Sequence, residues 1–281
     1  IDDRLDVTHG VTPTPRLDFA VEIRGPVVAS IEQTIRAVWS RAHLGASWRE
    51  EALATARSSE PWLKLRATLR RLRFARSRRG TAGPSLRPSQ PVQAALVIRD
   101  NLRQRRAIER SYVDAIARAV DRVDLISPYF YPGRHFRRAL IDAARRGVKV
   151  RVILQGKVDY RIAALAARVL YDEMLMHEIQ IHEYMHAYLH AKIAVVDGWW
   201  STVGSSNIDP LSLLLNLEAN VVVDDEWFAS QLRAAFDEAV ANSVQVGVPD
   251  LKTGWSAVVR RSLVKTLAHW YLSLAGISGR Y

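Results

Sequence analysis

The stretch Tyr188-Leu-His-Ala-Lys-Ile-Ala-Val-Val-Asp197 decides how this chain is expected to fold and what chemistry it can carry. Its alternating, β-branched residues predict a β-strand over 188–196. In a strand, residues two apart project to the same face. The sequence therefore predicts that the imidazole of His190 and the ammonium of Lys192 point together into one pocket.

The residues that follow this strand are expected to complete the same pocket wall. A second short strand is predicted over 199–203. It ends at Gly204, where the absence of a side chain lets the backbone pass close to a ligand. Ser205 and Asn207 then supply polar side chains. We expect Gly204 to contact the substrate, and Ser205 and Asn207 to act with the histidine and the lysine.

These residue types suit chemistry at phosphorus. An imidazole can attack phosphorus or transfer a proton near neutral pH. An ammonium and an amide can bind the non-bridging phosphate oxygens while negative charge develops on them. This chemistry requires no metal ion, and we expect neither a metal nor another cofactor.

The complete pattern, H-x-K-x4-D-x6-G-S-x-N, resembles the phospholipase D superfamily. Flanking segments narrow the resemblance to bacterial cardiolipin synthases, most nearly the B type. The similarity runs through most of the chain, and the segments that carry it are 95–100, 127–133, 143–150 and 204–220.

The resemblance implies an active site shared between two H-x-K halves, of which this chain contains one. The chain also opens with Ile1-Asp-Asp rather than a methionine, so we expect the first catalytic half to lie upstream of residue 1. In the family, one histidine attacks the phosphodiester and the other protonates the leaving alcohol. The resemblance favours the second role for His190, and it implies that Lys192 and Asn207 hold the phosphoryl oxygens.

Two glutamates in similar sequence contexts suggest that the same strand–helix unit occurs once in each half. Glu22 and Glu218 each lie in an expected strand that is followed by a helix. A carboxylate in a mostly apolar strand needs a partner, and a proton-transferring imidazole needs one on its other nitrogen. The resemblance implies that Glu22 orients His190 and that Glu218 orients the histidine of the other half. The alternative is that both glutamates face water at a sheet edge.

Three further residues of the pattern carry weaker expectations. Asp197 is expected to have a structural role, organising the catalytic strand or turning the chain before Gly198. Tyr129 and Phe130 follow an expected strand at its carboxyl end, where ligands of open α/β sheets bind. We expect them to line a lipid channel, with an aromatic loop that caps the core as the alternative.

A competing zinc motif, His182-Glu-Tyr-Met-His186, matches H-E-x-x-H. Such a site requires the residues to lie on a helix. Residues 178–184 alternate as in a strand, so the match is interpreted as coincidence and the two histidines as surface residues.

Composition indicates an anionic partner. The chain has 281 residues, no cysteine and a formal net charge of +11, which favours polyanions such as nucleic acid or an anionic membrane. Basic amphipathic patterns over 64–79 and 255–274 favour the membrane, with ordinary surface helices that pack an apolar stripe on the core as the alternative. With no run of about twenty apolar residues, we expect peripheral attachment. The predicted partners are phosphatidylglycerol, cardiolipin and the cytoplasmic side of a bacterial inner membrane, rather than nucleic acid.

The expected fold is an α/β sandwich with a mixed central sheet flanked by helices. Residues 1–45 are expected to be a remnant of the first half, 46–91 a basic linker, 92–245 the second half and 246–281 a basic tail.

The predicted function is phosphatidyl transfer from phosphatidylglycerol to an acceptor phospholipid through a phosphohistidine. Two alternatives remain at this point. One is a nuclease of the same superfamily in which two copies of the chain complete the site. The other is a catalytically silent module that binds anionic membranes, because half of an active site cannot divide the two proton transfers.

Overall fold

The computed structural model describes residues 5–6, 10–11, 14–39, 92–99, 104–157, 171–209 and 217–247. The chain divides into two compact units, one made of Ile1–Val21 with Val92–Tyr281 and the other of Glu22–Pro91. In the second unit the described part contains a helix over 27–39. The first unit contains the H-x-K motif and is built around a sheet.

The described strands of the central sheet are β3 (Gln93–Arg99), β4 (Arg122–Ile126), β5 (Lys149–Gln155), β6 (Gln180–Tyr184), β7 (Ile193–Val196), β8 (Trp200–Gly204), β9 (Glu218–Asp224) and β10 (Ser243–Gln245). Their order is β10-β6-β5-β4-β7-β8-β9-β3. Strands β4, β5 and β6 are parallel, and the other pairs are antiparallel. A separate antiparallel pair joins β1 (Leu5–Asp6) to β2 (Gly10–Val11).

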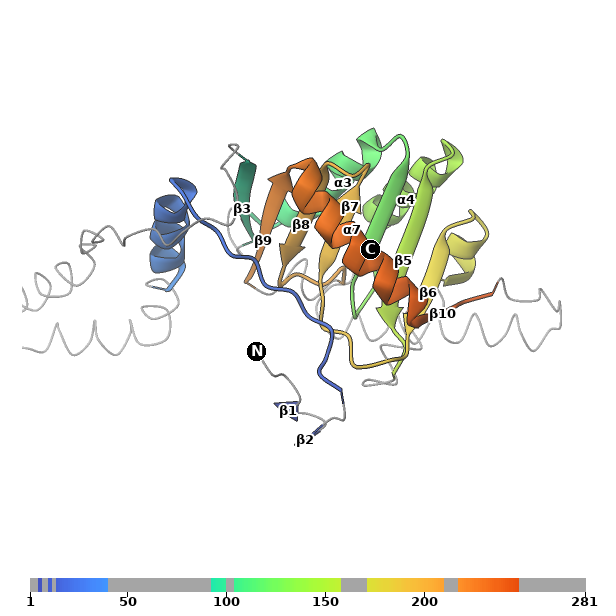
Figure 1. Cartoon of the computed structure of the whole chain (residues 1–281). Coiled ribbons are helices and arrows are strands. Elements are labelled where there is room, and N and C mark those ends of the chain that lie inside the picture. The colour runs from blue at the N-terminus through green and yellow to red at the C-terminus, as the bar shows by residue number, and fades with distance from the viewer. Residues whose placement is uncertain are drawn as a thin grey trace, which may run out of the picture. The chain divides into compact units, whose positions relative to one another are not determined.

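Helices cover both faces of this sheet (Figure 1). Helices α3 (Ala107–Arg118) and α4 (Arg134–Arg145) pack on one face, and α7 (Glu226–Ala241) packs on the other. The central strands are buried on both sides, as their nearly continuous apolar sequences require. The expected α/β sandwich with a mixed sheet is therefore confirmed.

Most expected elements are present, with differences at their ends. The strand expected over 188–196 begins at Ile193, because residues 188–191 bond to a different segment, near Leu17. No strand is assigned around Glu22, whereas the helix after it is present over 27–39. The short strand β10 was not anticipated. The expected linker 46–91 and most of the tail 246–281 lie outside the described residues.

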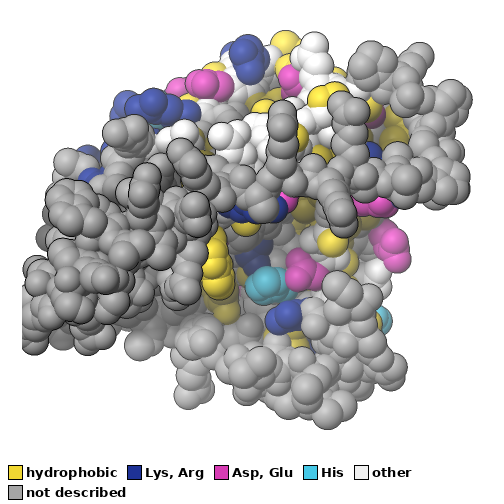
Figure 2. All heavy atoms as spheres, turned by 90° about the vertical axis from the view of Figure 1, so that its left-hand side faces the viewer, with side chains coloured by type: hydrophobic (Ala, Val, Ile, Leu, Met, Phe, Trp, Pro, Cys, Tyr) yellow, Lys and Arg dark blue, Asp and Glu magenta, His cyan; other side chains and the backbone are white. Residues whose placement is uncertain are grey.

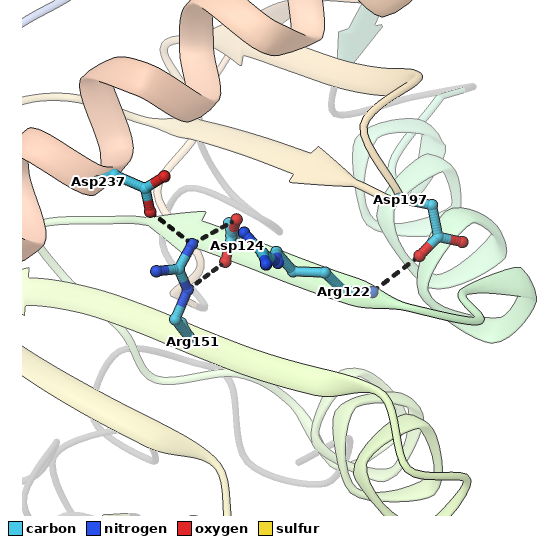
Figure 3. Close-up of polar contacts among 5 residues, drawn as sticks. All are labelled: Arg122, Asp124, Arg151, Asp197 and Asp237. Carbon is cyan, nitrogen blue, oxygen red and sulfur yellow. Dashed lines mark hydrogen bonds and ion pairs between the residues drawn. The ribbon is translucent and has the colours of Figure 1, made fainter.

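A buried charge network ties α7 to the sheet. Arg151 on β5 donates from Nε and Nη2 to the two carboxylate oxygens of Asp124 on β4, at 2.7 and 2.9 Å. The same guanidinium pairs with Asp237 on α7 at 2.8 Å (Figure 3). It also lies 4.6 Å from the ring centroid of Phe236. Asp124 is fully buried, so the bidentate pairing compensates a carboxylate that water cannot reach.

Two features are absent from the described part of the chain. No helix there combines the length and the apolar character needed to cross a bilayer. Likewise, none of its groups of three or more His, Asp or Glu side chains is arranged to hold a metal ion.

Candidate active site

The candidate site lies at the ends of two central strands of the sheet, where β4 ends and β7 begins. Ile126 and Ile193 pair at this end of the sheet. The chain enters β7 through residues 188–192, and a distant segment holds this approach in place. Leu17 forms a parallel bridge with Leu189 and exchanges backbone hydrogen bonds with Tyr188, His190 and Ala191 at 2.8–3.0 Å. These bonds bring residues 14–21 against the histidine.

This pairing supplies a carboxylate to His190. The Nδ1 atom of His190 lies 2.8 Å from Oδ2 of Asp18. The His190 side chain is about half exposed, with a relative accessibility of 49%. A ring held at Nδ1 by a carboxylate has a fixed orientation and tautomer, and its Nε2 atom is left for a substrate.

Asp18 is suited to this role because it is itself oriented. Its Oδ1 atom accepts a hydrogen bond of 2.9 Å from the backbone N–H of Phe19. Burial raises the pKa of the Asp18 carboxyl, but the hydrogen bonds from His190 and Phe19 lower it. Together with the nearby positive charges they outweigh burial, so the pKa of Asp18 lies below its usual value. Asp18 is therefore an anion when it faces the imidazole at neutral pH.

The family resemblance implies Glu22, rather than Asp18, at this nitrogen. In the structure Glu22 lies in the other unit, is largely exposed and accepts a 2.7 Å hydrogen bond from Nε of Arg24. The difference of four residues reflects register. The expected strand around Glu22 is absent, and the backbone pairs with the histidine segment at Leu17 instead.

Lys192 lies below the surface of the same site. Its side chain is buried, and its Nζ donates a 2.5 Å hydrogen bond to the carbonyl oxygen of His190. Burial lowers the pKa of Lys192 to about 8, although the negative charges of Asp18 and Glu218 act against this shift. Asp18 thus bonds to the histidine and acts electrostatically on the lysine, so the two motif residues share one polar cluster.

Figure 2 shows a histidine side chain beside an acidic and a basic side chain on one face of the molecule.

Burying Lys192 has a cost that can be measured. Because the pKa of Lys192 is about 8 in the folded state and 10.5 for an ordinary lysine, the unfolded state binds more protons between these pH values. Stability contributed by this group therefore rises with pH from 8 to 10.5. We expect Lys192→Met to stabilise the protein by about 2 kcal/mol at pH 7 and to flatten this rise, measured by denaturant titration. An equal or lower unfolding free energy in the variant at pH 7 would contradict this.

The segment after β8 is fixed by Asn220 on β9. A Cβ atom on Gly204 would lie 2.2 Å from Oδ1 of Asn220, so only glycine fits there. The buried Asn220 side chain accepts from the backbone N–H of Ser206 at 3.4 Å and donates to Oγ1 of Thr202 at 3.2 Å. Gly204 therefore serves close packing against Asn220, and this packing sets the path of Ser205 and Asn207.

Ser205 and Glu218 lie together at this end of the sheet. The Ser205 hydroxyl donates to Oε2 of Glu218 and accepts a 3.1 Å hydrogen bond from the N–H of Ala219. Glu218 also lies near enough to act on the charge of Lys192.

The aromatic loop after β4 packs against the Asn207 segment. Phe130 forms a parallel bridge with Ile208 and is buried in the core beneath α3 and α4. Tyr129 is partly exposed, and its carbonyl oxygen accepts a 2.7 Å hydrogen bond from the Ser127 hydroxyl. Of the two expected channel residues, Phe130 therefore belongs to the core.

Asp197 lies at the other end of β7, in the turn to β8. Its carboxylate accepts hydrogen bonds of 2.9 Å from the backbone N–H groups of Val120, Asp121 and Arg122, which lead into β4. Figure 3 shows the bond from Arg122. Its φ of +50° belongs to the left-handed region that aspartate tolerates better than most residues. These contacts join the two central strands, in keeping with a structural role for this residue.

The histidines of the H-E-x-x-H match do not lie on a helix. His182 is on strand β6, as expected, and it is buried rather than on the surface. Burial lowers the pKa of His182, and the nearby charge of Arg151 lowers it further. His186 follows the strand and is exposed.

Comparison with known proteins bears on this arrangement. Residues 112–240, which include the whole motif, match the family model described as "Cardiolipin synthase, PLD-like domain". The chain carries a phospholipase D-like domain of the cardiolipin synthase type.

The phospholipase D-like domain is found in relatives that are longer than this chain. Cardiolipin synthase B of Salmonella typhi is 35% identical over 252 residues, which cover 86% of this chain and 54% of that protein. Cardiolipin synthase B of Escherichia coli K12 is 36% identical over 233 residues, covering 83% and 50%. The chain spans about half the length of these curated relatives.

A solved structure supports the fold of the phospholipase D-like domain. The crystal structure of phosphatidylserine synthase from Haemophilus influenzae Rd KW20 aligns with a TM-score of 0.50, covering 75% of this chain and 53% of that one. Sequence identity is 13%, so this similarity shows the fold alone.

Proposed function

We propose that this chain supplies one half of the active site of a phosphatidyltransferase of the cardiolipin synthase type. The reaction would move a phosphatidyl group from phosphatidylglycerol to the hydroxyl of an acceptor phospholipid. The observation that carries the proposal is the Asp18–His190 pair beside the buried Lys192, inside a chain similar to cardiolipin synthases B. This is an acid–base group next to a cation, as transfer of a phosphoryl group needs.

In the proposed mechanism His190 handles protons. The histidine of a second H-x-K half attacks the donor phosphorus, the P–O bond to glycerol breaks, and a phosphohistidine forms. His190 gives a proton to the departing glycerol oxygen. It then takes the proton of the acceptor hydroxyl, whose oxygen attacks phosphorus and releases the other histidine. Asp18 at Nδ1 compensates the charge of the imidazole while it carries the proton.

Lys192 and Asn207 are proposed to hold the non-bridging oxygens of the transferred group. Lys192 donates one hydrogen bond to the carbonyl of His190, and an ammonium has three donors, so two remain for phosphate. Its pKa of about 8 means that the charge is mostly present at neutral pH. Asn207 lies in the segment whose path is fixed by Gly204 and Asn220.

A second H-x-K half is proposed because the sequence contains a single H-x-K. One histidine cannot be the nucleophile and the acid in the same step. The test therefore uses a protein that joins this chain to a second H-x-K half, incubated with phosphatidylglycerol vesicles. The expected result is release of glycerol and formation of cardiolipin, and mass spectrometry measures both products. A folded protein of this kind that cleaves DNA and leaves lipids unchanged would contradict the proposal.

Asp18 is proposed as the residue that positions His190. We expect Asp18→Asn to lower kcat by about 10²- to 10³-fold with little change in KM, because the amide neither fixes the tautomer nor compensates the imidazolium. Asp18→Glu should recover part of the rate and shift the pH profile. The comparison variant is Glu22→Gln. If Glu22→Gln loses the activity and Asp18→Asn keeps it, the assignment to Asp18 is wrong.

Both lipids of this reaction reside in a bilayer. We therefore propose that the protein attaches peripherally to the cytoplasmic side of a bacterial inner membrane, with anionic phospholipids as partners. The net charge of +11 supports an anionic surface as the partner.

A further inference from the structure

Helix α3 presents a regular stripe of charge to solvent. Arg106, Arg110, Asp114 and Arg118 follow one another at intervals of four residues, and all four are exposed. Residues four apart lie on the same side of a helix. The opposite side of α3 is apolar and packs on the sheet. The outward side therefore carries three arginines and one aspartate.

Helix α4 repeats this arrangement beside it. Arg134, Arg138, Asp142 and Arg145 occupy nearly the same intervals on the side of α4 that faces away from the sheet. The two helices pack against each other, with Tyr112 and Phe136 in ring contact at 5.7 Å. Their stripes thus form one surface, which we call the α3–α4 face.

Ion pairs compensate part of this positive charge. Within the described residues, Arg145 pairs with Asp142 at 3.5 Å, and the 3.9 Å contact of Arg106 is with Glu109. Among the described residues, no ion pair is formed by the other four arginines of the two stripes, Arg110, Arg118, Arg134 and Arg138.

The other face of the sheet has the opposite character. Helix α7 exposes three acidic side chains, Glu226, Asp237 and Glu238, and its one basic residue, Arg233, is partly buried. Figure 1 shows that α7 and the α3–α4 pair lie on opposite sides of the sheet. The sheet unit is therefore electrically polar, with a basic face and an acidic face, and an anionic surface would orient it.

Exposed apolar side chains flank the basic face. Val120, directly after α3, is 81% exposed, and Met176 is 68% exposed. Met176 follows the helical residues 171–175, which are tied to α4 by a 3.3 Å contact between Arg137 and Glu173. Arginines with neighbouring apolar side chains match the boundary between lipid headgroups and acyl chains. A nucleic acid would use the arginines and leave these apolar side chains in water.

We propose that the α3–α4 face docks the protein on an anionic lipid bilayer. The proposal rests on the proposed function, since that function places both substrates in a membrane, and it adds which face lies against it. A cation near an anionic membrane surface contributes about a fivefold gain in partitioning. Six arginines arranged on one face are sufficient for reversible attachment, which suits an enzyme that exchanges lipid substrates.

The test measures sedimentation of the full chain with vesicles of phosphatidylglycerol and phosphatidylcholine. Substituting glutamine for the four arginines without ion pairs, Arg110, Arg118, Arg134 and Arg138, should lower the partition coefficient about 600-fold. Lysine at the same four positions should keep it within about threefold, because the attraction depends on charge. Sedimentation of the glutamine variant equal to that of the unchanged chain would overturn the proposal.

A gain of binding separates docking from a loss of folding. Asp114→Asn with Asp142→Asn removes both acidic residues of the stripes and should raise partitioning about tenfold or more. Glu226→Gln with Glu238→Gln adds the same charge on the acidic face and should change it less than threefold. Equal gains from both pairs would show dependence on net charge alone and contradict the assignment of a face.

Two further results bear on the partner and on the chemistry. Tighter, arginine-dependent binding to DNA than to vesicles would assign the face to nucleic acid and overturn the membrane proposal. Face-dependent sedimentation supports docking even if the joined protein fails to form cardiolipin, and in that case the proposed function alone fails.

Discussion

His190→Asn is expected to abolish phosphatidyl transfer, with a loss of about 10³-fold or more, in the protein that joins this chain to a second H-x-K half. Removal of a positioned acid–base group costs about 10²- to 10⁴-fold, and here the same ring serves two proton transfers. Asparagine can occupy the space of the ring and can bond to Asp18, but it cannot carry a proton at neutral pH. The measurement is product formation in lipid extracts.

Binding to vesicles provides the control for this variant. His190 lies at the ends of the central strands and not on the α3–α4 face, so sedimentation with phosphatidylglycerol vesicles should be unchanged. The far-ultraviolet circular dichroism should also match, because the His190 side chain is half exposed and is not part of the core. Cardiolipin formation at the unaltered rate would refute the role given to His190.

Arg151→Met is expected to have the largest effect on stability, lowering the free energy of unfolding by about 3–5 kcal/mol at pH 7. The substitution removes both hydrogen bonds to Asp124, whose carboxylate is fully buried, and also the pairing with Asp237 on α7. A buried charge without a partner is far less favourable than a buried pair. The measurement is urea denaturation followed by circular dichroism.

A double substitution tests this explanation. Asp124→Asn in the Arg151→Met background removes the uncompensated charge and should recover part of the lost stability. Burial raises the pKa of Asp124, so the single variant should also lose less stability at pH 5 than at pH 7, because the carboxyl takes up a proton. A double variant that is less stable than Arg151→Met would contradict the account, as would a loss independent of pH.

Sequence patterns were sufficient for most of the fold. Alternation and β-branching located β6 and β8 within a few residues, because a strand is defined by local periodicity that neighbouring residues carry themselves. The same alternation separated the strand over His182 from a helical zinc motif. The spacing of the H-x-K pattern was also enough to identify the family, since it is a property of the chain alone.

Local patterns were less informative at the points where the chain changes direction. Residues 188–191 carry the alternation of a strand, yet they bond to Leu17 and not to a sheet strand. The apolar pattern of Phe130 is the same for a core residue and a channel residue, and packing beneath α3 and α4 decides for the core. Periodicity gives the face of an element but not its partner.

By itself, then, the sequence determined the α/β class, the order of most elements and the residues His190 and Lys192. The tertiary structure decided which carboxylate serves the histidine. Asp18 is 172 positions away from His190 in the chain, and it reaches the ring because backbone hydrogen bonds at Leu17 fix the register of the two segments. A shift of a few residues would present a different side chain. No local pattern specifies such a long-range register, because its energy arises only when the two segments meet.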